Sequence, residues 1–306
     1  MGKAQRDAVN AAIREAAKGL VADTIDERRA LFETRAQPGD TRGLTATETV
    51  LGGRPALEII DEARDAGTLL YFHGGGYVVG SHRTGARLAA ELVRRTGLRA
   101  WSLDYRLAPE HRIPAAALDG LAAYRELLER GADPAHIVIA GDSAGGHLTV
   151  GTLLLARDAG LPMPAAAVVF SPMSDLAMTG ASLTSKGGVD PIFTRADIEF
   201  FAAQQVGDGG IDSPIASPGR VGDLRGLPPF LIQTGSYEVL LSDSVLLAGR
   251  LGEADVDVTL EIVGGVPHVF PDLFGQLDEA DAALDRAAAF IDGRLAVAAP
   301  VAALAE

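Results

Sequence analysis

Cysteine is absent from the 306-residue chain. Its absence excludes disulfide bonds, thiol nucleophiles and metal sites built from thiolates. Basic residues are scarce relative to acidic ones: 27 Lys and Arg stand against 41 Asp and Glu, which gives a formal net charge of −14. A surface this acidic repels the phosphates of nucleic acids and the headgroups of anionic lipids. We therefore expect neither nucleic acid nor a membrane as a partner.

Long apolar runs are also missing. No stretch approaches 18 uninterrupted apolar residues, so the sequence predicts no membrane-spanning helix. Charged residues are spread through residues 1–20, which contain no apolar segment of the kind found in signal peptides. Together with the lack of cysteine, these features favour a cytoplasmic protein.

Most of the chain alternates between short apolar segments and segments with helical spacing. Strands are expected at 68–72, 99–103, 137–140, 165–170, 229–233 and 256–263. Helices are expected at 83–96, 114–130, 143–157, 242–251 and 276–295. A hairpin with Gly52-Gly53 at its turn is expected to precede them. Strands this apolar are buried on both faces, so the pattern predicts an α/β fold with a mostly parallel central sheet and helices on both faces.

Two regions depart from this alternation. Residues 3–35 are predicted to be helical, and residues 171–228 are rich in Pro, Gly, Ser and Asp, with one expected helix at 196–205. We expect residues 1–45 and the insertion 171–228 to form a helical cap over the crevice of a catalytic domain that spans 46–295. The Ala-rich residues 296–306 predict an unstructured C-terminal tail.

The segment Gly141-Asp142-Ser143-Ala144-Gly145 has the GxSxG pattern of a nucleophile elbow. Glycine is abundant in the chain, so the five-residue match alone has little weight. However, the segment follows an expected strand and opens an expected helix, which is the setting that an elbow requires. The alternative is a glycine-rich turn that binds phosphate at the start of a helix. The context favours Ser143 as a nucleophile.

A second glycine-rich segment, His73-Gly74-Gly75-Gly76, directly follows the expected strand 68–72. Consecutive glycines leave backbone N–H groups unshielded, so that they can face a developing negative charge on oxygen. The N–H groups of Gly75 and Gly76, together with that of Ala144 beside the nucleophile, are the candidate oxyanion hole. The alternative is a flexible loop without a role.

These two motifs, together with Tyr105-Arg106-Leu107-Ala108-Pro109-Glu110, resemble the hormone-sensitive-lipase family of bacterial carboxylesterases, of the GDSAGG type. The resemblance covers roughly residues 45–295 in the same motif order. The segment 231–235, followed by Glu238-Val239-Leu240-Leu241, is similar to a subset that includes heroin esterase and monoterpene lactone hydrolases. The resemblance implies an α/β-hydrolase fold.

A serine nucleophile needs a base, and histidine titrates in the right range. In this fold the chain order is serine, acid, histidine, and only His268 follows the last expected strand. The other histidines lie before the nucleophile, at the far end of a strand or on the nucleophile's own helix: His73, His82, His111, His136 and His147.

The acid is expected in the loop after the strand 229–233, where Glu238 and Asp243 both qualify. The family usually has Asp within an Asp-Pro-Leu segment, and Glu238-Val239-Leu240 aligns with it. We therefore predict Glu238 as the acid, with Asp243 as the runner-up. If Asp243 is not the acid, it is expected to support the start of the helix 242–251.

Several residues near the motifs have expected supporting roles. Arg106 and Glu110 are expected to fix the loop that carries Pro109, and Asp142 is expected to pair with a cation. Four phenylalanines are candidates for either the substrate pocket or the apolar core: Phe193, Phe200, Phe201 and Phe274.

The predicted activity is that of a serine carboxylesterase acting on a small-molecule ester or lactone with a short-to-medium acyl chain. No zinc-binding histidine pair, Walker loop or dinucleotide glycine pattern is present in the sequence, so no cofactor or metal is implied. Two alternatives stay open: an amidase or peptidase on the same triad, and a silent ligand-binding receptor of the same fold, similar to the gibberellin receptor. The sequence leaves the oligomeric state open, and a homodimer is the state that the resemblance suggests.

Overall fold

The computed structural model of the chain describes residues 2–18, 22–37, 40–206 and 210–298. Its strands are β1 (Thr45–Leu51), β2 (Arg54–Ile60), β3 (Thr68–Phe72), β4 (Arg99–Leu103), β5 (Ile137–Asp142), β6 (Ala166–Phe170), β7 (Phe230–Tyr237) and β8 (Val258–Pro267). In the described residues they form one eight-stranded sheet, in the order β1-β2-β4-β3-β5-β6-β7-β8. The hairpin of β1 and β2 is antiparallel, and β2 pairs antiparallel with β4. The remaining neighbours are parallel. The predicted mostly parallel sheet is confirmed.

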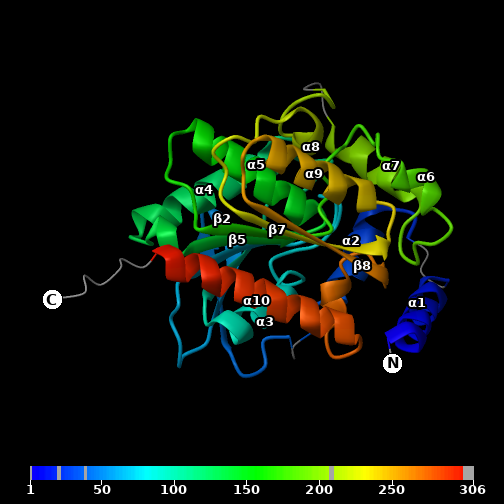
Figure 1. The fold of residues 1–306 in the computed structure, drawn as a ribbon, viewed down its shortest axis with the longest axis horizontal. Helices are drawn as coiled ribbons and strands as arrows, with labels where there is room; N and C mark the ends of the chain where they lie inside the picture. The colour runs from blue at the N-terminus through cyan, green and yellow to red at the C-terminus, as the bar shows by residue number, and fades with distance from the viewer. Residues whose placement is uncertain (1, 19–21, 38–39, 207–209, 299–306) are drawn as a thin grey trace.

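Helices cover both faces of this sheet (Figure 1). The longer ones are α1 (Gly2–Ala17), α2 (Ile25–Glu33), α3 (Ala86–Thr96), α4 (Ala115–Glu129), α5 (Ala144–Asp158), α7 (Arg195–Gln205), α9 (Leu241–Glu253) and α10 (Asp278–Ala298). Shorter turns are α6 (Ser182–Ser185), α8 (Pro218–Val221) and the 3-10 segments η1 (Pro134–His136) and η2 (Phe270–Leu273). In Figure 1, α4, α5 and α9 lie above the sheet, and α3 and α10 lie below it.

Alternation along the strands creates two apolar cores, because successive side chains point to opposite faces. Leu70 and Phe72 on β3 are buried with α4, α5 and α9. Leu69 and Tyr71 on the same strand are buried with α3 and α10. This pattern explains why the strands read as continuous apolar runs in the sequence.

The parallel register brings the ends of the central strands to one edge. Asp142 at the end of β5 pairs with Phe170 at the end of β6, which in turn pairs with Gln233 on β7. The segments that follow, including Ser143, therefore leave the sheet side by side. His268 comes directly after β8, whose partner is β7. The fold thus gathers the predicted site residues at the carboxyl edge of the sheet.

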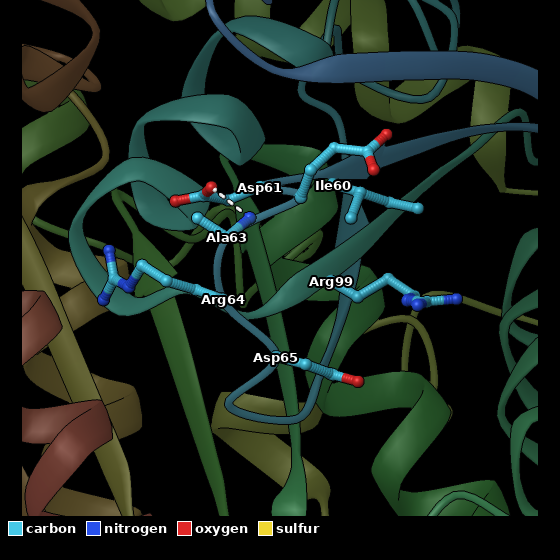
Figure 2. A pocket seen from close by; sticks show the side chains of 7 residues that line it. Ile60, Asp61, Ala63, Arg64, Asp65 and Arg99 are labelled. Atoms are coloured by element: carbon cyan, nitrogen blue, oxygen red, sulfur yellow. Dashed lines mark hydrogen bonds between the residues drawn. The ribbon is translucent and has the colours of Figure 1, made fainter.

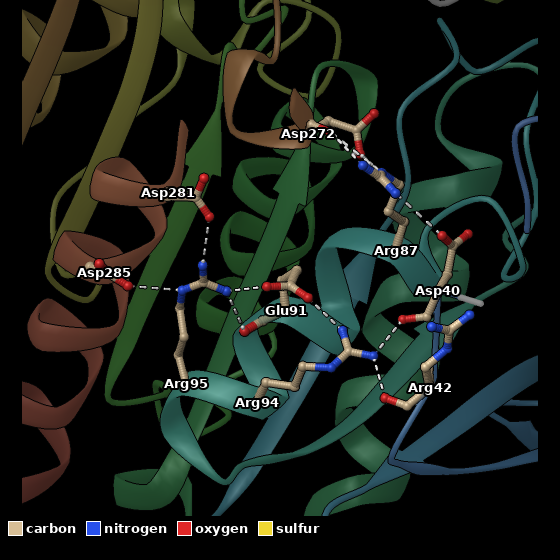
Figure 3. Close-up of polar contacts among 9 residues, drawn as sticks. All are labelled: Asp40, Arg42, Arg87, Glu91, Arg94, Arg95, Asp272, Asp281 and Asp285. Carbon is tan, nitrogen blue, oxygen red and sulfur yellow. Dashed lines mark hydrogen bonds and ion pairs between the residues drawn. The ribbon is translucent and has the colours of Figure 1, made fainter. Parts of the chain in front are cut away.

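An ion-pair network joins α3 to α10 and to the segment around Asp40 (Figure 3). Arg95 on α3 contacts Asp285 at 3.0 Å and Asp281 at 3.4 Å on α10, and it also pairs with Glu91. Arg87 reaches Asp272 on η2 at 3.0 Å. The α3–α10 ion-pair network comprises Asp40, Arg87, Glu91, Arg94, Arg95, Asp272, Asp281 and Asp285, and Arg94 also donates to the backbone carbonyl of Arg42.

The N-terminal region differs from its prediction. Instead of one helix over 3–35, the structure has α1 and α2, and α2 begins anew at a capping box formed by Thr24 and Glu27. Residues 19–21, which include Gly19, lie outside the described residues. A fresh N-cap marks a new helix, and helical periodicity alone did not reveal it.

The insertion and the C-terminus are also more helical than expected. The insertion contains α6 and α8 in addition to the expected helix, which is α7. The last helix, α10, continues to Ala298, three residues into the predicted tail, and residues 299–306 lie outside the described residues. In the part of the chain that the structure describes, no helix is both long and apolar enough to cross a membrane.

Candidate active site

Ser143 lies in the turn between β5 and α5, and the turn is unusually tight. Its backbone has φ 53° and ψ −116°, a conformation that residues other than glycine rarely adopt. A Cβ atom on Gly145 would overlap the carbonyl oxygen of Phe72, so only glycine fits there. The N–H group of Ser143 donates to the carbonyl of Phe170 at 2.8 Å. The strand–turn–helix setting predicted for Ser143 is present.

The glycine loop follows β3 and lies against this turn. A Cβ atom on Gly74 would overlap the carboxylate of Asp142, the residue before the serine. Gly75 and Gly76 have φ values of 118° and 60°. In the described residues, no backbone carbonyl accepts a hydrogen bond from the N–H of either glycine. The N–H of Ala144 lies at the first position of α5, where no intrahelical acceptor exists. These three groups are available to an oxygen of a bound molecule.

His268 and Glu238 form a direct pair. His268 Nδ1 donates to Glu238 Oε2 at 2.6 Å, and both side chains are buried. Because Nδ1 carries this proton, the other ring nitrogen, Nε2, is the one able to accept a proton in the neutral ring. Nε2 has no hydrogen-bond partner in the described residues, so no hydrogen bond joins it to Ser143.

The second carboxylate oxygen of Glu238 accepts three hydrogen bonds. Its donors are the Ser171 hydroxyl at 2.9 Å, the Gly235 N–H at 2.6 Å and the Thr234 hydroxyl. Donors at this density fix the orientation of a buried carboxylate and stabilise its charge. We call Ser171, Thr234, Gly235, Glu238 and His268 the Glu238 cluster.

Asp243, the alternative acid, is held elsewhere. Its carboxylate accepts a hydrogen bond from the N–H of Asp175 at 3.0 Å, and among the contacts of the described residues none joins it to His268. Burial, together with the nearby charges of Asp175 and Glu238, raises the pKa of Asp243 to about 8, although hydrogen bonds from backbone N–H groups oppose the shift. Asp243 lies in the first turn of α9, but its carboxylate holds the segment around Asp175 instead of capping its own helix.

The charge around His268 favours its protonated form. Burial opposes a charge on the ring, but the carboxylates of Glu238, Asp190 and Asp142 outweigh it, so the pKa of His268 lies above its ordinary range. An imidazolium that forms at this position is therefore stabilised by its surroundings.

Asp142 has a different partner from the one expected. The Tyr71 hydroxyl donates to its carboxylate at 2.8 Å, and no cation contacts it in the described part of the chain. Burial, supplemented by the charge of Asp272, raises the pKa of Asp142 to about 6 although the Tyr71 hydrogen bond opposes the shift. The expected cation pair is wrong because a strand residue that points to the α3–α10 face supplies the hydrogen bond.

His73 supports the glycine loop. Its ring stacks on Tyr105 at a centroid distance of 4.2 Å, and the Tyr105 hydroxyl donates to the His73 carbonyl at 2.7 Å. Its Nδ1 lies 2.7 Å from the Gly74 carbonyl and must donate to it. Burial lowers the pKa of His73 to about 4, so the ring is neutral and acts as a spacer.

Arg106 and Glu110 each anchor the loop between them to a different helix. Arg106 pairs with Asp119 on α4 at 2.7 Å, and Glu110 pairs with Arg29 on α2 at 2.6 Å. Arg29 also donates to the backbone carbonyl of Val78, just past the glycine loop, at 2.9 Å. These contacts agree with the expected supporting role.

Two of the four phenylalanines border the site. Phe193 meets the His268 ring edge-to-face at 5.2 Å, and Phe201 lies 6.2 Å from Phe193. Phe201 is also so close to Gly76 that a Cβ atom there would overlap its ring. Both come from the insertion and form an aromatic wall between the histidine and the glycine loop. The other two, Phe200 and Phe274, lie under Arg28 and Arg87, respectively.

Polar groups of the insertion connect this wall to the acid. Asp190 accepts hydrogen bonds from the N–H groups of Ile192 and Phe193, at 2.8 and 3.0 Å. Its other oxygen accepts from the N–H of Val239, next to Glu238, at 2.8 Å. Sequence reasoning missed Asp190, because only the folded insertion brings it to the acid loop.

The sequence analysis also did not identify Ser171 and Thr234, although their positions in the chain could have indicated them. Both directly follow expected strands, at the carboxyl edge where parallel sheets collect functional polar groups.

A surface hollow elsewhere on the molecule lacks this arrangement of groups. A surface hollow of about 330 Å³ lies beside residues 60–65 and Arg99, and its side chains point apart from one another (Figure 2). Arg99 begins β4, so this hollow is at the opposite edge of the sheet from Ser143. Over the described ranges, no group of three or more His, Asp or Glu residues is arranged to hold a metal ion.

Comparisons with known proteins agree with this geometry. The sequence matches the family described as "alpha/beta hydrolase fold" over residues 69–272. An acetyl-hydrolase of Streptomyces hygroscopicus is 39% identical over 268 residues, which cover 87% of this chain and 89% of that protein.

Solved structures extend the likeness to the whole fold. A crystal structure of an esterase from the bacterial hormone-sensitive lipase family superposes with a TM-score of 0.91 at 39% identity, covering 96% of this chain and 99% of the other. A structure of EstE5 soaked with p-nitrophenyl butyrate has a TM-score of 0.90 at 37% identity and covers 97% of this chain and all of the other. The chain therefore belongs to the α/β-hydrolase fold family and, within it, to the bacterial hormone-sensitive-lipase esterases.

Proposed function

We propose that the protein is a serine carboxylesterase in which Ser143 is the nucleophile, His268 the base and Glu238 the acid. The observation that carries this assignment is the 2.6 Å hydrogen bond from His268 Nδ1 to Glu238 Oε2. It leaves Nε2 to accept a proton at the edge of the sheet where Ser143 holds its strained conformation. The relatives named acetyl-hydrolase and esterase support ester hydrolysis as the activity.

The proposed reaction has two halves. Ser143 Oγ attacks the ester carbonyl while His268 Nε2 takes its proton, and the protonated histidine then gives that proton to the leaving alcohol. A water molecule repeats the sequence on the acyl-enzyme and releases the acid. Glu238 keeps the imidazole in the required tautomer and stabilises its charge, in line with the raised pKa of His268.

The negative oxygen of each tetrahedral intermediate needs donors. The N–H groups of Gly75, Gly76 and Ala144 are assigned to it, since no backbone carbonyl in the described part of the chain accepts from them. Losing one such donor typically costs about 3 kcal/mol of transition-state stabilisation. Substrate binding must also bring Ser143 and His268 into hydrogen-bond contact, a tightening that is common when an enzyme takes up its substrate.

The cap is proposed to restrict the acyl chain. Its two parts touch one another, because Arg14 on α1 donates to the Val189 carbonyl and Arg28 on α2 lies over Phe200. The aromatic wall of Phe193 and Phe201 belongs to this cap and closes one side of the site. We therefore expect esters with acyl chains of about two to eight carbons to be preferred over long-chain lipids. The butyrate ester soaked into EstE5 is a substrate-sized molecule of this kind.

The test is a panel of p-nitrophenyl esters of increasing acyl length, run with wild-type protein and Ser143→Ala. Wild-type kcat/KM should peak at short chains, and the variant should lose roughly a millionfold in kcat while keeping its fold. A serine-directed organophosphate should label Ser143 alone. Activity retained by Ser143→Ala would refute the assignment. A value of kcat/KM that keeps rising into long chains would refute the proposed chain-length limit.

The same panel, extended with a lactone and the matching anilide amide, addresses the range of substrates. The proposal predicts faster turnover of the ester than of the amide. Faster turnover of the amide would assign an amidase on the same triad, and no turnover of any activated ester would assign a binding protein.

A further inference from the structure

Ser171 follows β6 directly and is completely buried. Its hydroxyl donates to Glu238 Oε1 at 2.9 Å and accepts from the N–H of Val269 at 3.0 Å. Val269 is the residue immediately after His268. One hydroxyl therefore contacts the side chain of the proposed acid and the backbone beside the proposed base.

The backbone at both ends of this contact is strained. Ser171 has φ 48° and Val269 has φ 50°, both in the left-handed region. A β-branched residue such as valine is a true outlier there, and such conformations persist only where the surroundings enforce them. The hydrogen bond from Val269 to Ser171 spans 98 residues of sequence and is one such constraint. It holds the turn that sets the direction of the His268 side chain.

Thr234 provides an internal comparison. Its hydroxyl also donates to Glu238 Oε1, but within the described residues that hydroxyl makes no hydrogen bond to the His268 segment. The three donors to Oε1 are thus unequal, because Ser171 alone among them also bonds the backbone beside the histidine.

We propose that Ser171 is a positioning residue whose bridging hydroxyl holds the side chains of Glu238 and His268 in a fixed position relative to each other. This inference rests on the proposed triad and adds a residue to it. Ser171 does not touch the reacting atoms. Its effect is to keep Nε2 of the imidazole aimed at the nucleophile while the ring gains and loses a proton. Small misplacements of a catalytic group have large effects on rate, so the bridge is expected to act on kcat.

The main test is Ser171→Ala, assayed with p-nitrophenyl butyrate. We expect kcat to fall by about ten- to a hundredfold while KM changes less than about threefold, because the substrate contacts are untouched. Ser171→Cys keeps a side chain of similar size and a weak donor, and it should recover part of the loss. The cysteine variant also provides a folded protein if the alanine variant is unstable.

Two matched controls distinguish a positioning role in catalysis from a contribution to the stability of the fold. Ser174 is a buried serine in the same segment, and its hydroxyl donates to the Asp243 carbonyl at 2.9 Å instead of to the triad. Ser174→Ala should change kcat by no more than about twofold, even if its melting temperature falls as far as that of Ser171→Ala. Thr234→Val removes a donor to Glu238 without touching Val269, so its loss in kcat should be smaller than that of Ser171→Ala.

Two further readouts would not respond to a purely structural role. In a Glu238→Gln background, Ser171→Ala should cost only about threefold more, since residues that act as a unit are not additive. The acidic limb of kcat/KM against pH should also move to lower pH in Ser171→Ala. His268 then loses part of its contact with Glu238, while Asp190 and Asp142 still face it.

The outcomes distinguish a failure of the positioning role of Ser171 from a failure of the proposed triad. Equal kcat for Ser171→Ala and Ser174→Ala would overturn the positioning role, as would a full additional loss in the Glu238→Gln background or an unmoved acidic limb. In these cases Ser143→Ala still reports on the triad by itself. If Ser143→Ala is active, the proposed function fails first and the role of Ser171 fails with it.

Discussion

The Glu238 cluster and the α3–α10 ion-pair network both concentrate charge, but they lie in different surroundings. Glu238 is fully buried, and in the described residues every hydrogen bond to its carboxylate comes from one of four neighbours in its cluster. In the network, Asp285 is 72% exposed and Asp281 is 45% exposed (Figure 3). Buried polar groups lose their hydration, so a missing partner is expensive, whereas exposed ion pairs compete with water and salt.

This difference in burial indicates where a substitution should impair function most. In the cluster, one atom displaced changes the proton affinity and direction of His268. In the network, Arg94 and Arg95 form four ion pairs with three acidic partners, and each pair contributes little to stability. Contact number is therefore a poor guide to importance, and burial together with direction is a better one.

The largest effect should come from breaking the cluster at its acid. Glu238→Gln keeps the shape of the side chain but removes the charge that fixes the imidazole tautomer, so kcat should fall on the order of ten-thousandfold at neutral pH. The measurement is steady-state kinetics with p-nitrophenyl butyrate.

Asp243→Asn is the matched control for that change, because it makes a similar substitution at a buried acid nearby in the chain, in the first turn of α9. Its carboxylate holds the segment around Asp175, so kcat should stay within about threefold of wild type. A severe loss in Asp243→Asn with an active Glu238→Gln would transfer the role of acid to Asp243.

A smaller effect should come from removing residues 1–35, which contact the insertion through Arg28 and the segment just past the glycine loop through Arg29. The sheet and both apolar cores remain, so activity should fall by at least about tenfold while the core keeps its cooperative unfolding. Kinetics and thermal denaturation on the same sample measure both properties. A variant that is fully active, or one that fails to fold, would contradict a cap that lies outside the core.

The pH dependence refines the comparison further. His268 must be neutral to accept a proton, and its pKa lies above the ordinary range, so kcat/KM should fall as the pH drops through that raised value. The midpoint of the fall in kcat/KM on the acidic side should thus lie above the usual histidine pKa of about 6.5. In Glu238→Gln the limb should shift to lower pH. A limb that Glu238→Gln leaves in place would show that Glu238 does not set the proton affinity of the base.

The smallest effect should come from the network itself. Arg95→Ala removes contacts to Glu91, Asp281 and Asp285, and the free energy of unfolding should fall by about 1 kcal/mol or less in urea titrations. High salt should reduce the difference in the free energy of unfolding between wild type and Arg95→Ala, and kcat should not change. A loss of activity comparable to that of Ser171→Ala would show that α3 and α10 influence the site.

The parts of the fold that the sequence predicted are those governed by periodicity and local geometry. Apolar runs identified the strands, and the GxSxG segment located the turn at Ser143, because few residue types fit a turn this tight. The break between α1 and α2 escaped prediction, since helical spacing continues across it and only the capping box at Thr24 marks the new start.

Contacts between distant segments were harder to predict. The sequence placed Glu238 near His268 through chain order, but it did not reveal Ser171 or Asp190, whose partners are 98 and 49 residues away. It also assigned a cation to Asp142, which instead uses the hydroxyl of Tyr71 from a neighbouring strand region. Partners of buried polar groups depend on register and side-chain direction, and neither is visible in a single sequence.

The crowding around Gly145 has a consequence for how this enzyme can be changed. No larger side chain fits against Phe72 there, so the residues of the turn at Ser143 tolerate almost no substitution. Phe193 and Phe201, by contrast, belong to an insertion outside the sheet and approach the site only through their rings. Mutant libraries aimed at new acyl or alcohol groups should therefore be confined to the insertion. There, substrate range can diverge while the chemistry at the sheet edge is inherited intact.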